Sequence, residues 1–207
     1  MNSPSAAAPL ATPGPGLVAL PVPVVRGAIS LEETLVRRRT VRDLATRELT
    51  PDQLGQLLWA AQGLTGDEGR RTAPSAGGMH PLEVYAATHA GLFHYEPAEH
   101  ALRPLGKVDL RAQLRAAAFD QAAVGDAALV IVLTGVVART QVKYGERAER
   151  YVLLEAGHAA QNVLLEAVAL GLAALPVGSF DDGRVLAVLG ASAAETPLYL
   201  LPVAHPA

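Results

Sequence analysis

The sequence contains no cysteine among its 207 residues. Disulfide bridges, thiolate zinc sites, cysteine-ligated iron–sulfur clusters and cysteine nucleophiles are therefore excluded. Any redox chemistry carried out by this chain requires a bound cofactor.

Aromatic residues are also scarce, and the chain has no excess of positive charge. Only 4% of the residues are Phe, Trp or Tyr, and 17 Lys and Arg stand against 20 Asp and Glu, for a net charge of −3. Nucleic-acid-binding proteins combine a basic surface with aromatic platforms on which bases stack. We therefore expect no nucleic-acid partner.

Long hydrophobic runs are missing as well. The most apolar interior run, residues 127–138, is shorter than the roughly 20 residues that a membrane-spanning helix needs. The first basic residue is Arg26, and the apolar residues before it are interrupted by Pro9, Pro13, Pro15, Pro21 and Pro23, so the sequence predicts no secretory signal peptide. We expect a cytoplasmic protein without a membrane partner.

What the sequence does contain is enough apolar material for one large core, because 50% of its residues are hydrophobic. Residues 1–27 are rich in Ala, Pro and Gly without periodicity, which predicts a flexible N-terminal arm. Residues 28–207 are predicted to form a single domain.

Capping and periodicity predict a mixture of helices and strands. Helices are expected after Ser30, Thr50 and Asp109, over residues 147–172, and from Asp181 to a stop at Gly190. Strands are expected at residues 82–88, 92–95, 101–105, 127–134 and 197–201. Because no regular strand–helix repeat is present, the predicted fold class is α+β.

The spacing of the histidines and acidic residues predicts no metal site. Glu155 and His158 have the spacing of a carboxylate-bridged metal site, but a second Glu-x-x-His motif is missing, which favours a polar pair satisfied inside a bundle or interface. Four other histidines are expected to be solvated, namely His89, His94, His100 and His205.

A basic run follows the first predicted helix and reads Arg38-Arg39-Thr40-Val41-Arg42. Guanidinium groups and a hydroxyl offer many donors to a phosphate dianion. Arginines at the end of a helix also complement its dipole, so the run alone leaves both interpretations open.

Two loops are rich in small residues. One reads Pro74-Ser75-Ala76-Gly77-Gly78, and the other contains Val177-Gly178-Ser179 ahead of Asp181. Small residues allow backbone N–H and C=O groups to approach a flat polar ring. Either loop alone could equally be a simple turn.

Taken in chain order, five segments resemble the flavin-dependent nitroreductase family. They read RRRTVR, APSAGGMHP, KYGERAERYVLLEAGHAAQNVLLEAVALGL, PVGSFDD and PLYLLPV, and they span about residues 30–203. The chain is most similar to the SagB-type branch, dehydrogenases that oxidise thiazoline and oxazoline rings in peptides to azoles. Gly78, where many general nitroreductases carry asparagine, favours this branch.

The resemblance implies a nitroreductase-like fold, with a central, mainly antiparallel sheet flanked by helices, in an intertwined homodimer. It implies FMN as the cofactor, with its phosphate held by Arg38, Arg39 and Thr40. Arg42 would reach the N1/O2 edge of the ring, where a cation stabilises the anionic reduced flavin. Residues 74–78 would border the ring and ribityl chain, and the turn at residues 177–179 would direct the amides of Gly178 and Ser179 toward N5 or O4.

Lys143 and Tyr144 resemble the catalytic pair of the azoline-oxidising branch. Aromatising an azoline removes a hydride to flavin N5 and a proton from the adjacent carbon, so the reaction needs a base. Neighbours on a helix point about 100° apart, and both can serve one pocket only on a loop or at a helix end. The alternative is a solvated pair at the start of a helix.

Two other functions stay open. One is an NAD(P)H-dependent reductase of nitroaromatics or quinones, which would act on a small molecule instead of a peptide. The other is a catalytically silent dimeric scaffold in a peptide-modifying complex.

Overall fold

The computed structural model describes residues 14–66 and 69–207, which fold around one antiparallel sheet. The strand order is β1-β5-β4-β3-β6-β8-β2, and β7 also pairs with β8. The strands are β1 (Val18–Ala19), β2 (Leu44–Ala45), β3 (Leu82–Thr88), β4 (Gly91–Glu96), β5 (Ala101–Gly106), β6 (Leu129–Gly135), β7 (Ala173–Ala174) and β8 (Thr196–Pro206).

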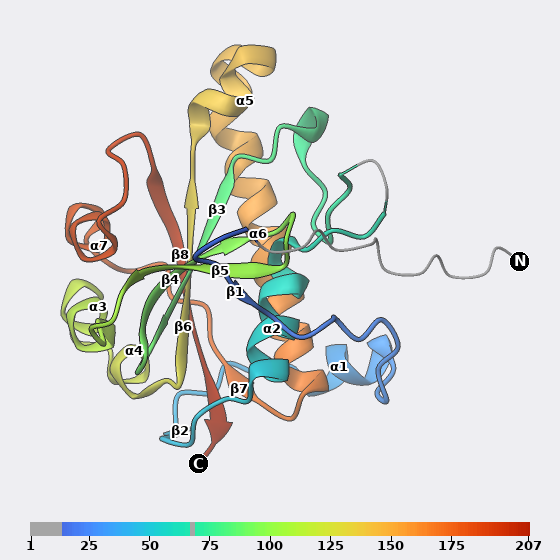
Figure 1. Cartoon of the computed structure of the whole chain (residues 1–207), viewed down its shortest axis with the longest axis vertical. Coiled ribbons are helices and arrows are strands. Elements are labelled where there is room, and N and C mark those ends of the chain that lie inside the picture. Colours follow the sequence, from blue (N-terminus) through green and yellow to red (C-terminus); the bar gives the residue numbers. More distant parts are fainter. Residues whose placement is uncertain (1–13, 67–68) are drawn as a thin grey trace, which may run out of the picture.

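Helices cover both faces of this sheet. They are α1 (Leu31–Arg37), α2 (Pro51–Gln62), α3 (Arg111–Ala117), α4 (Ala122–Asp126), α5 (Val137–Tyr144), α6 (Ala148–Ala169) and α7 (Asp182–Leu189), with 3-10 turns η1 (Ala76–Gly78) and η2 (Gly145–Arg147). Figure 1 shows α2 and α6 on one side of the sheet and α3, α4 and α7 on the other. The predicted α+β class with a flanked antiparallel sheet is confirmed.

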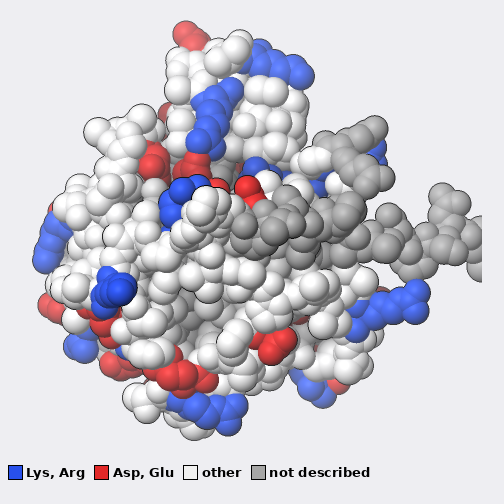
Figure 2. Space-filling view, in the orientation of Figure 1, with Lys and Arg blue, Asp and Glu red and all other residues white. Residues whose placement is uncertain are grey.

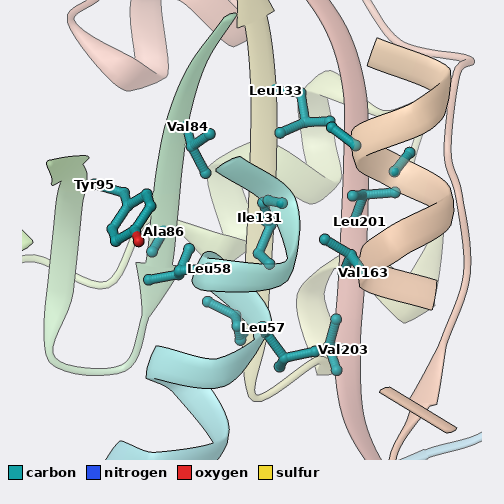
Figure 3. Close-up of a cluster of buried hydrophobic side chains, with 14 of the residues drawn as sticks. Leu57, Leu58, Val84, Ala86, Tyr95, Ile131, Leu133, Val163, Leu201 and Val203 are labelled. Atoms are coloured by element: carbon teal, nitrogen blue, oxygen red, sulfur yellow. The ribbon is translucent and has the colours of Figure 1, made fainter. Parts of the chain in front are cut away.

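The central strand β6 supplies side chains to two cores. Leu129, Ile131 and Leu133 belong to the cluster under α2 and α6, whereas Val130 and Val132 belong to the cluster under α3 and α7. Successive side chains of a strand point to opposite faces, so a strand covered on both sides is apolar throughout. Figure 3 shows the first cluster, where α2 and α6 pack on β3, β6 and β8.

Local signals set the predicted helix ends. Thr50 and Gln53 form the predicted capping box at the start of α2, with each side chain bonded to the other residue's backbone N–H. Asp181 caps α7 by accepting a hydrogen bond from the Arg184 amide at 2.9 Å. Gly190 ends α7 with a φ of 61°, a left-handed conformation that glycine adopts without strain.

Several elements differ from the predictions. Helices α4 and α5 were not predicted, and α3 begins at Arg111, one residue later than a cap at Asp109 would give. The Asp109 carboxylate nevertheless accepts a hydrogen bond from the Arg111 amide at 3.0 Å. Strand β8 continues to Pro206, beyond the predicted end at residue 201, because Val203 and Ala204 are also buried.

The described part of the predicted N-terminal arm packs against the domain. Strand β1 pairs with β5, and Leu20 is buried in the core. The Gln56 side chain holds Val24 through two hydrogen bonds, of 2.8 and 2.9 Å, to its N–H and C=O. Residues 1–13 lie outside the described residues, and a domain boundary near residue 27 stays a prediction.

Two of the four histidines expected to be solvated are not. His100 is 1% exposed and bonds Tyr95 Oη and the Pro21 carbonyl through its two ring nitrogens, at 2.8 and 2.9 Å. His94 lies between two carboxylates on the sheet, with its side chain 18% exposed. That prediction is wrong for both, because strand pairing brings distant partners over them. His89 is exposed, and His205 is partly buried.

Across residues 14–66 and 69–207, no helix is both long and apolar enough to span a bilayer. On the described part of the face shown in Figure 2, basic and acidic side chains are interspersed. The positive charge on this face is therefore not gathered into one basic surface.

Candidate functional site

The arginine run leaves the end of α1 in an extended conformation. Arg38 is the C-cap, with φ −55° and ψ 120°, and its N–H still bonds the Thr34 carbonyl. Three residues later, the Val41 amide donates to the Ala174 carbonyl of β7 at 3.3 Å. The run is thereby held beside the segment that leads into the turn at residues 177–179.

The donors of this run divide into two kinds. Arg39 Nη1 donates to the carbonyls of Val36 and Arg38, both at 2.8 Å, which is the helix-capping role considered above. The guanidinium groups of Arg38 and Arg42 and the hydroxyl of Thr40 have no hydrogen-bond partner within the described residues. These three side chains are therefore available to an anion, whereas Arg39 is partly committed to backbone.

The turn after β7 presents free amides. Val177 pairs with Leu200 through hydrogen bonds of 2.8 and 3.0 Å, which fix the turn against β8. Gly178 and Ser179 are exposed, and their N–H groups take no part in a hydrogen bond with any described residue. A Cβ on Gly178 would meet only the Tyr199 ring at 3.9 Å, so packing does not demand a glycine there. We call residues 38–42 and 177–179 the α1–β7 surface.

The loop at residues 74–78 contains the 3-10 turn η1. Gly77 and Gly78 have φ angles of 62° and 69°, which L-residues with a side chain rarely adopt. The Ser75 hydroxyl accepts a hydrogen bond from the His80 amide at 2.9 Å and so closes the loop. Pro74 is exposed at its start and Ala76 is partly buried.

Lys143 and Tyr144 converge on this loop. A Cβ built on Gly77 would lie 2.8 Å from Tyr144 Oη and 2.9 Å from Lys143 Nζ. The two neighbours reach one point because Tyr144 ends α5, with φ −118° and ψ 0° outside the helical range. Tyr144 also packs edge-on against Tyr151, with 5.0 Å between ring centroids. We call this cluster the α5–η1 surface.

A buried carboxyl group lies beneath the η1 loop. Glu155 of α6 is 2% exposed, and its Oε1 has no partner among the described residues. Burial raises the pKa of Glu155 to about 7, although the Ser75 hydroxyl and the Arg71 guanidinium favour its charged form. Arg71 is itself partly buried, where it donates to Gln62 Oε1 at 2.9 Å and burial lowers its pKa.

Within one chain Glu155 and His158 do not form a satisfied pair, because His158 is exposed while Glu155 is buried with an unpartnered oxygen, and an interface role for them stays a prediction. No group of three metal-ligating side chains is found in the part of the chain that the structure describes. The sequence carried one signal for the buried acid. Glu155 is a charged residue among Val152, Ala156 and Ala159, on the apolar face of a long helix.

The two surfaces lie far apart in one copy of the chain. Figure 1 shows α5 at one end of the long axis and α1 and β7 toward the other. The structure thus brings residues 38–42 to β7, three residues before the 177–179 turn, and residues 143–144 to the 74–78 loop. It does not bring these two sets together within one chain.

A cavity of about 580 Å³ lies elsewhere, between residues 24–29 and helices α1, α2 and α6. Its wall includes Trp59, Asn162 and Glu166, and burial raises the pKa of Glu166. None of the predicted site residues lines it.

The model of the nitroreductase family matches residues 35–205. A protein of Methanocaldococcus jannaschii is 37% identical over 181 residues, covering 84% of this chain and 90% of that protein. A crystal structure from Ralstonia eutropha has a TM-score of 0.85 and 29% identity, and covers 98% of this chain and 96% of that one. Both are called nitroreductases, in each case as a provisional assignment.

A third relative has a more specific name. The microcin B17-processing protein McbC of Escherichia coli is 29% identical over 127 residues, or 56% of this chain. The matched part is 47% of McbC, so this chain spans about half of that protein.

Proposed function

The chain belongs to the nitroreductase family of oxidoreductases, and from this premise we propose that it is an FMN-dependent dehydrogenase of azoline-type rings in peptides. The observation that carries the proposal is the convergence of Lys143 and Tyr144 on Gly77. These are the residues that resemble the catalytic pair and the flavin loop of the SagB-type branch. The similarity to McbC, a protein named for processing a peptide, supports the same substrate class.

The α1–β7 surface fits the polar parts of FMN. Arg38, Arg42 and Thr40 offer donors that no described residue uses, and a phosphate dianion accepts several charge-assisted hydrogen bonds. The free amides of Gly178 and Ser179 suit the polar edge of a flavin ring. When bound, FMN supplies the chemistry that this cysteine-free chain lacks, because its ring accepts a hydride.

Lys143 would carry the proton. Conversion of an azoline to an azole removes two hydrogens, one as a hydride, which FMN would accept when bound, and the other as a proton. In this proposal Lys143 Nζ takes the proton from the ring carbon, and Tyr144 Oη orients the substrate beside it. Both atoms stand at Gly77, where the absence of a side chain leaves room for the ends of Lys143 and Tyr144.

Two copies of the chain would complete each site. The α1–β7 surface of one copy would face the α5–η1 surface of its partner, because one copy separates them along its long axis. Large apolar side chains more than half exposed are available for burial in such a homodimer. They are Leu31, Leu35 and Val36 on α1, and Leu153 and Leu154 on α6.

Complementation tests this arrangement. Arg38→Ala and Lys143→Ala each damage a different surface, so a mixed dimer that shares its sites keeps one intact site. At an FMN concentration too low to load Arg38→Ala, refolding the two variants together should restore activity that neither has alone. Mixtures as inactive as their components would contradict shared sites.

Lysine substitution tests the catalytic assignment. Lys143→Ala should retain FMN but lose reduction of the flavin by an azoline peptide under anaerobic conditions, because the ring proton has no acceptor. Lys107, the only other lysine, is exposed in the connection after β5, so Lys107→Ala is the matched control. Normal turnover by Lys143→Ala would remove its role as the base.

An NAD(P)H-dependent reductase of nitroaromatics or quinones is the second candidate, favoured by the relatives called nitroreductases. The electron donor separates the two functions. Rapid anaerobic bleaching of the flavin by NADH or NADPH would indicate a reductase, and bleaching only by an azoline peptide would indicate the dehydrogenase. A catalytically silent scaffold would respond to neither.

A further inference from the structure

Arg139 lies one helical turn before Lys143 on α5, so the two side chains share a face of the helix. Its guanidinium makes two contacts outside α5. Nη1 donates to the His80 carbonyl at 3.2 Å, and Nη2 donates to the Glu83 carboxylate. Arg139 therefore joins α5 to the segment that runs from η1 into β3.

The end of the Lys143 side chain also lies at this segment. The His80 amide bonds Ser75 Oγ at 2.9 Å, which ties the Arg139 contact to the loop that contains Gly77. Helix α5 thus meets one loop at two points a turn apart, at His80 through Arg139 and at Gly77 through Lys143 and Tyr144. Two such points fix both the position and the rotation of the helix.

The acidic partner of Arg139 is itself held in the sheet. Glu83 Oε2 bonds His94 Nε2 at 2.8 Å, and His94 Nδ1 lies 3.1 Å from Glu96 Oε1, which accepts a bond from Arg103 Nε at 2.7 Å. The Glu83 and His94 side chains are each 18% exposed. Burial opposes the charged form of each, but their mutual bond and the nearby charges leave the pKa of His94 raised and that of Glu83 lowered. Arg139 therefore binds a carboxylate whose position is fixed by its hydrogen bond to His94.

Besides these contacts, helix α5 packs against α6, and Tyr144 lies edge-on against Tyr151. Of its eight residues only Thr140 is buried, while Val142 is 89% exposed. Because the helix has no broad apolar face, polar contacts contribute to its placement beside this packing.

We propose that Arg139 is a positioning residue. Its contacts with His80 and Glu83 hold the end of α5 so that Lys143 and Tyr144 meet Gly77. Arginine suits this role because its planar fork serves two acceptors at once, which the single ammonium of lysine does less well. This placement of α5 is argued from contacts within the chain and does not depend on the proposed function. The consequence for catalysis rests on the proposed function.

A distance measurement tests the placement without any substrate. The sequence has no cysteine, so spin labels at Val142→Cys on α5 and Leu105→Cys on β5 would be unique, and both sites are exposed. Arg139→Ala should broaden or shift the distance distribution between these labels in the FMN-loaded protein. Arg103→Ala, which removes the arginine at the far end of the same chain of charges, should leave it unchanged. An unchanged distribution in Arg139→Ala would overturn the proposal.

Kinetics test the consequence. With an azoline peptide at saturation, Arg139→Ala should slow flavin reduction by about 10–100-fold, the range expected for misplacing a reacting group by about 1 Å. Its FMN content should match that of Arg103→Ala, and Arg139→Lys should recover part of the rate. A normal rate in Arg139→Ala would contradict the proposal. If the wild-type protein oxidises no azoline while Arg139→Ala still moves the labels, the proposed function fails and the positioning role stands.

Discussion

Replacement of Gly77 by alanine probes the point where the candidate catalytic pair meets the flavin loop. The added Cβ would stand 2.8 Å from Tyr144 Oη and 2.9 Å from Lys143 Nζ, whereas ordinary contacts begin near 3.4 Å. Both are the far ends of flexible side chains, so each can retreat by about 0.5 Å at little cost in stability. The retreat nevertheless moves both groups away from the place where the proposal needs them.

Backbone strain adds a second effect that a control removes. An L-residue in the left-handed region loses about 1–2 kcal/mol, which lowers the melting temperature of a domain of this size by roughly 2–8 °C. Gly78 has a similar φ, of 69° against 62°, but a Cβ there would meet nothing within 4 Å. Gly78→Ala therefore carries the same strain without touching the catalytic pair.

The assay compares the two variants directly. Thermal unfolding should show similar losses of stability for Gly77→Ala and Gly78→Ala. Anaerobic stopped-flow reduction by an azoline peptide should be about tenfold or more slower in Gly77→Ala than in Gly78→Ala, because a misplaced base loses reactivity steeply. Equal rates in the two variants would refute the idea that Lys143 and Tyr144 act at Gly77.

Two other substitutions test the polar groups of the candidate site. Arg38→Ala should weaken FMN binding about 10–100-fold by titration calorimetry, since a hydrogen bond to a charged group contributes about 1.5–3 kcal/mol; Arg37→Ala, which removes an arginine paired with Glu33, should not. Equal effects would remove Arg38 from the phosphate site. Native Glu155 keeps its proton up to about pH 7 and the unfolded chain releases it near 4.5, so stability should fall by up to about 3 kcal/mol as pH rises through this window. In urea unfolding Glu155→Gln should lack this fall, and parallel pH curves for the two proteins would contradict the assignment.

The sequence predicted those elements whose signal is local. The capping box at Thr50, the alternation at residues 82–88 and the stop at Gly190 each involve residues within a few positions of one another. Helix α5 escaped prediction because it has almost no apolar face, and contacts with residues 77–83, more than fifty positions earlier, hold it in place. Burial of His100 has the same kind of cause, since its partner Pro21 is 79 positions away.

For the candidate site, the residue types and their order along the chain indicated which residues to consider. They did not indicate which of these residues lie together in space. Lys143 and Tyr144 were expected to serve one pocket only on a loop or at a helix end, and they lie at the end of α5. Nothing in the local pattern indicates that this pair lies at the opposite end of the molecule from α1, or that Glu155 is buried below Ser75. Both facts depend on how the sheet orders its strands, which is a long-range property.

The flavin content of the purified protein tests the central claim most directly. Protein freed of unbound ligand after incubation with FMN should show a flavin absorption spectrum, and denaturation should release FMN in an amount comparable to the chain. Colourless protein that retains no added FMN would contradict the assignment of Arg38, Thr40 and Arg42 to a phosphate site, and with it the proposed chemistry.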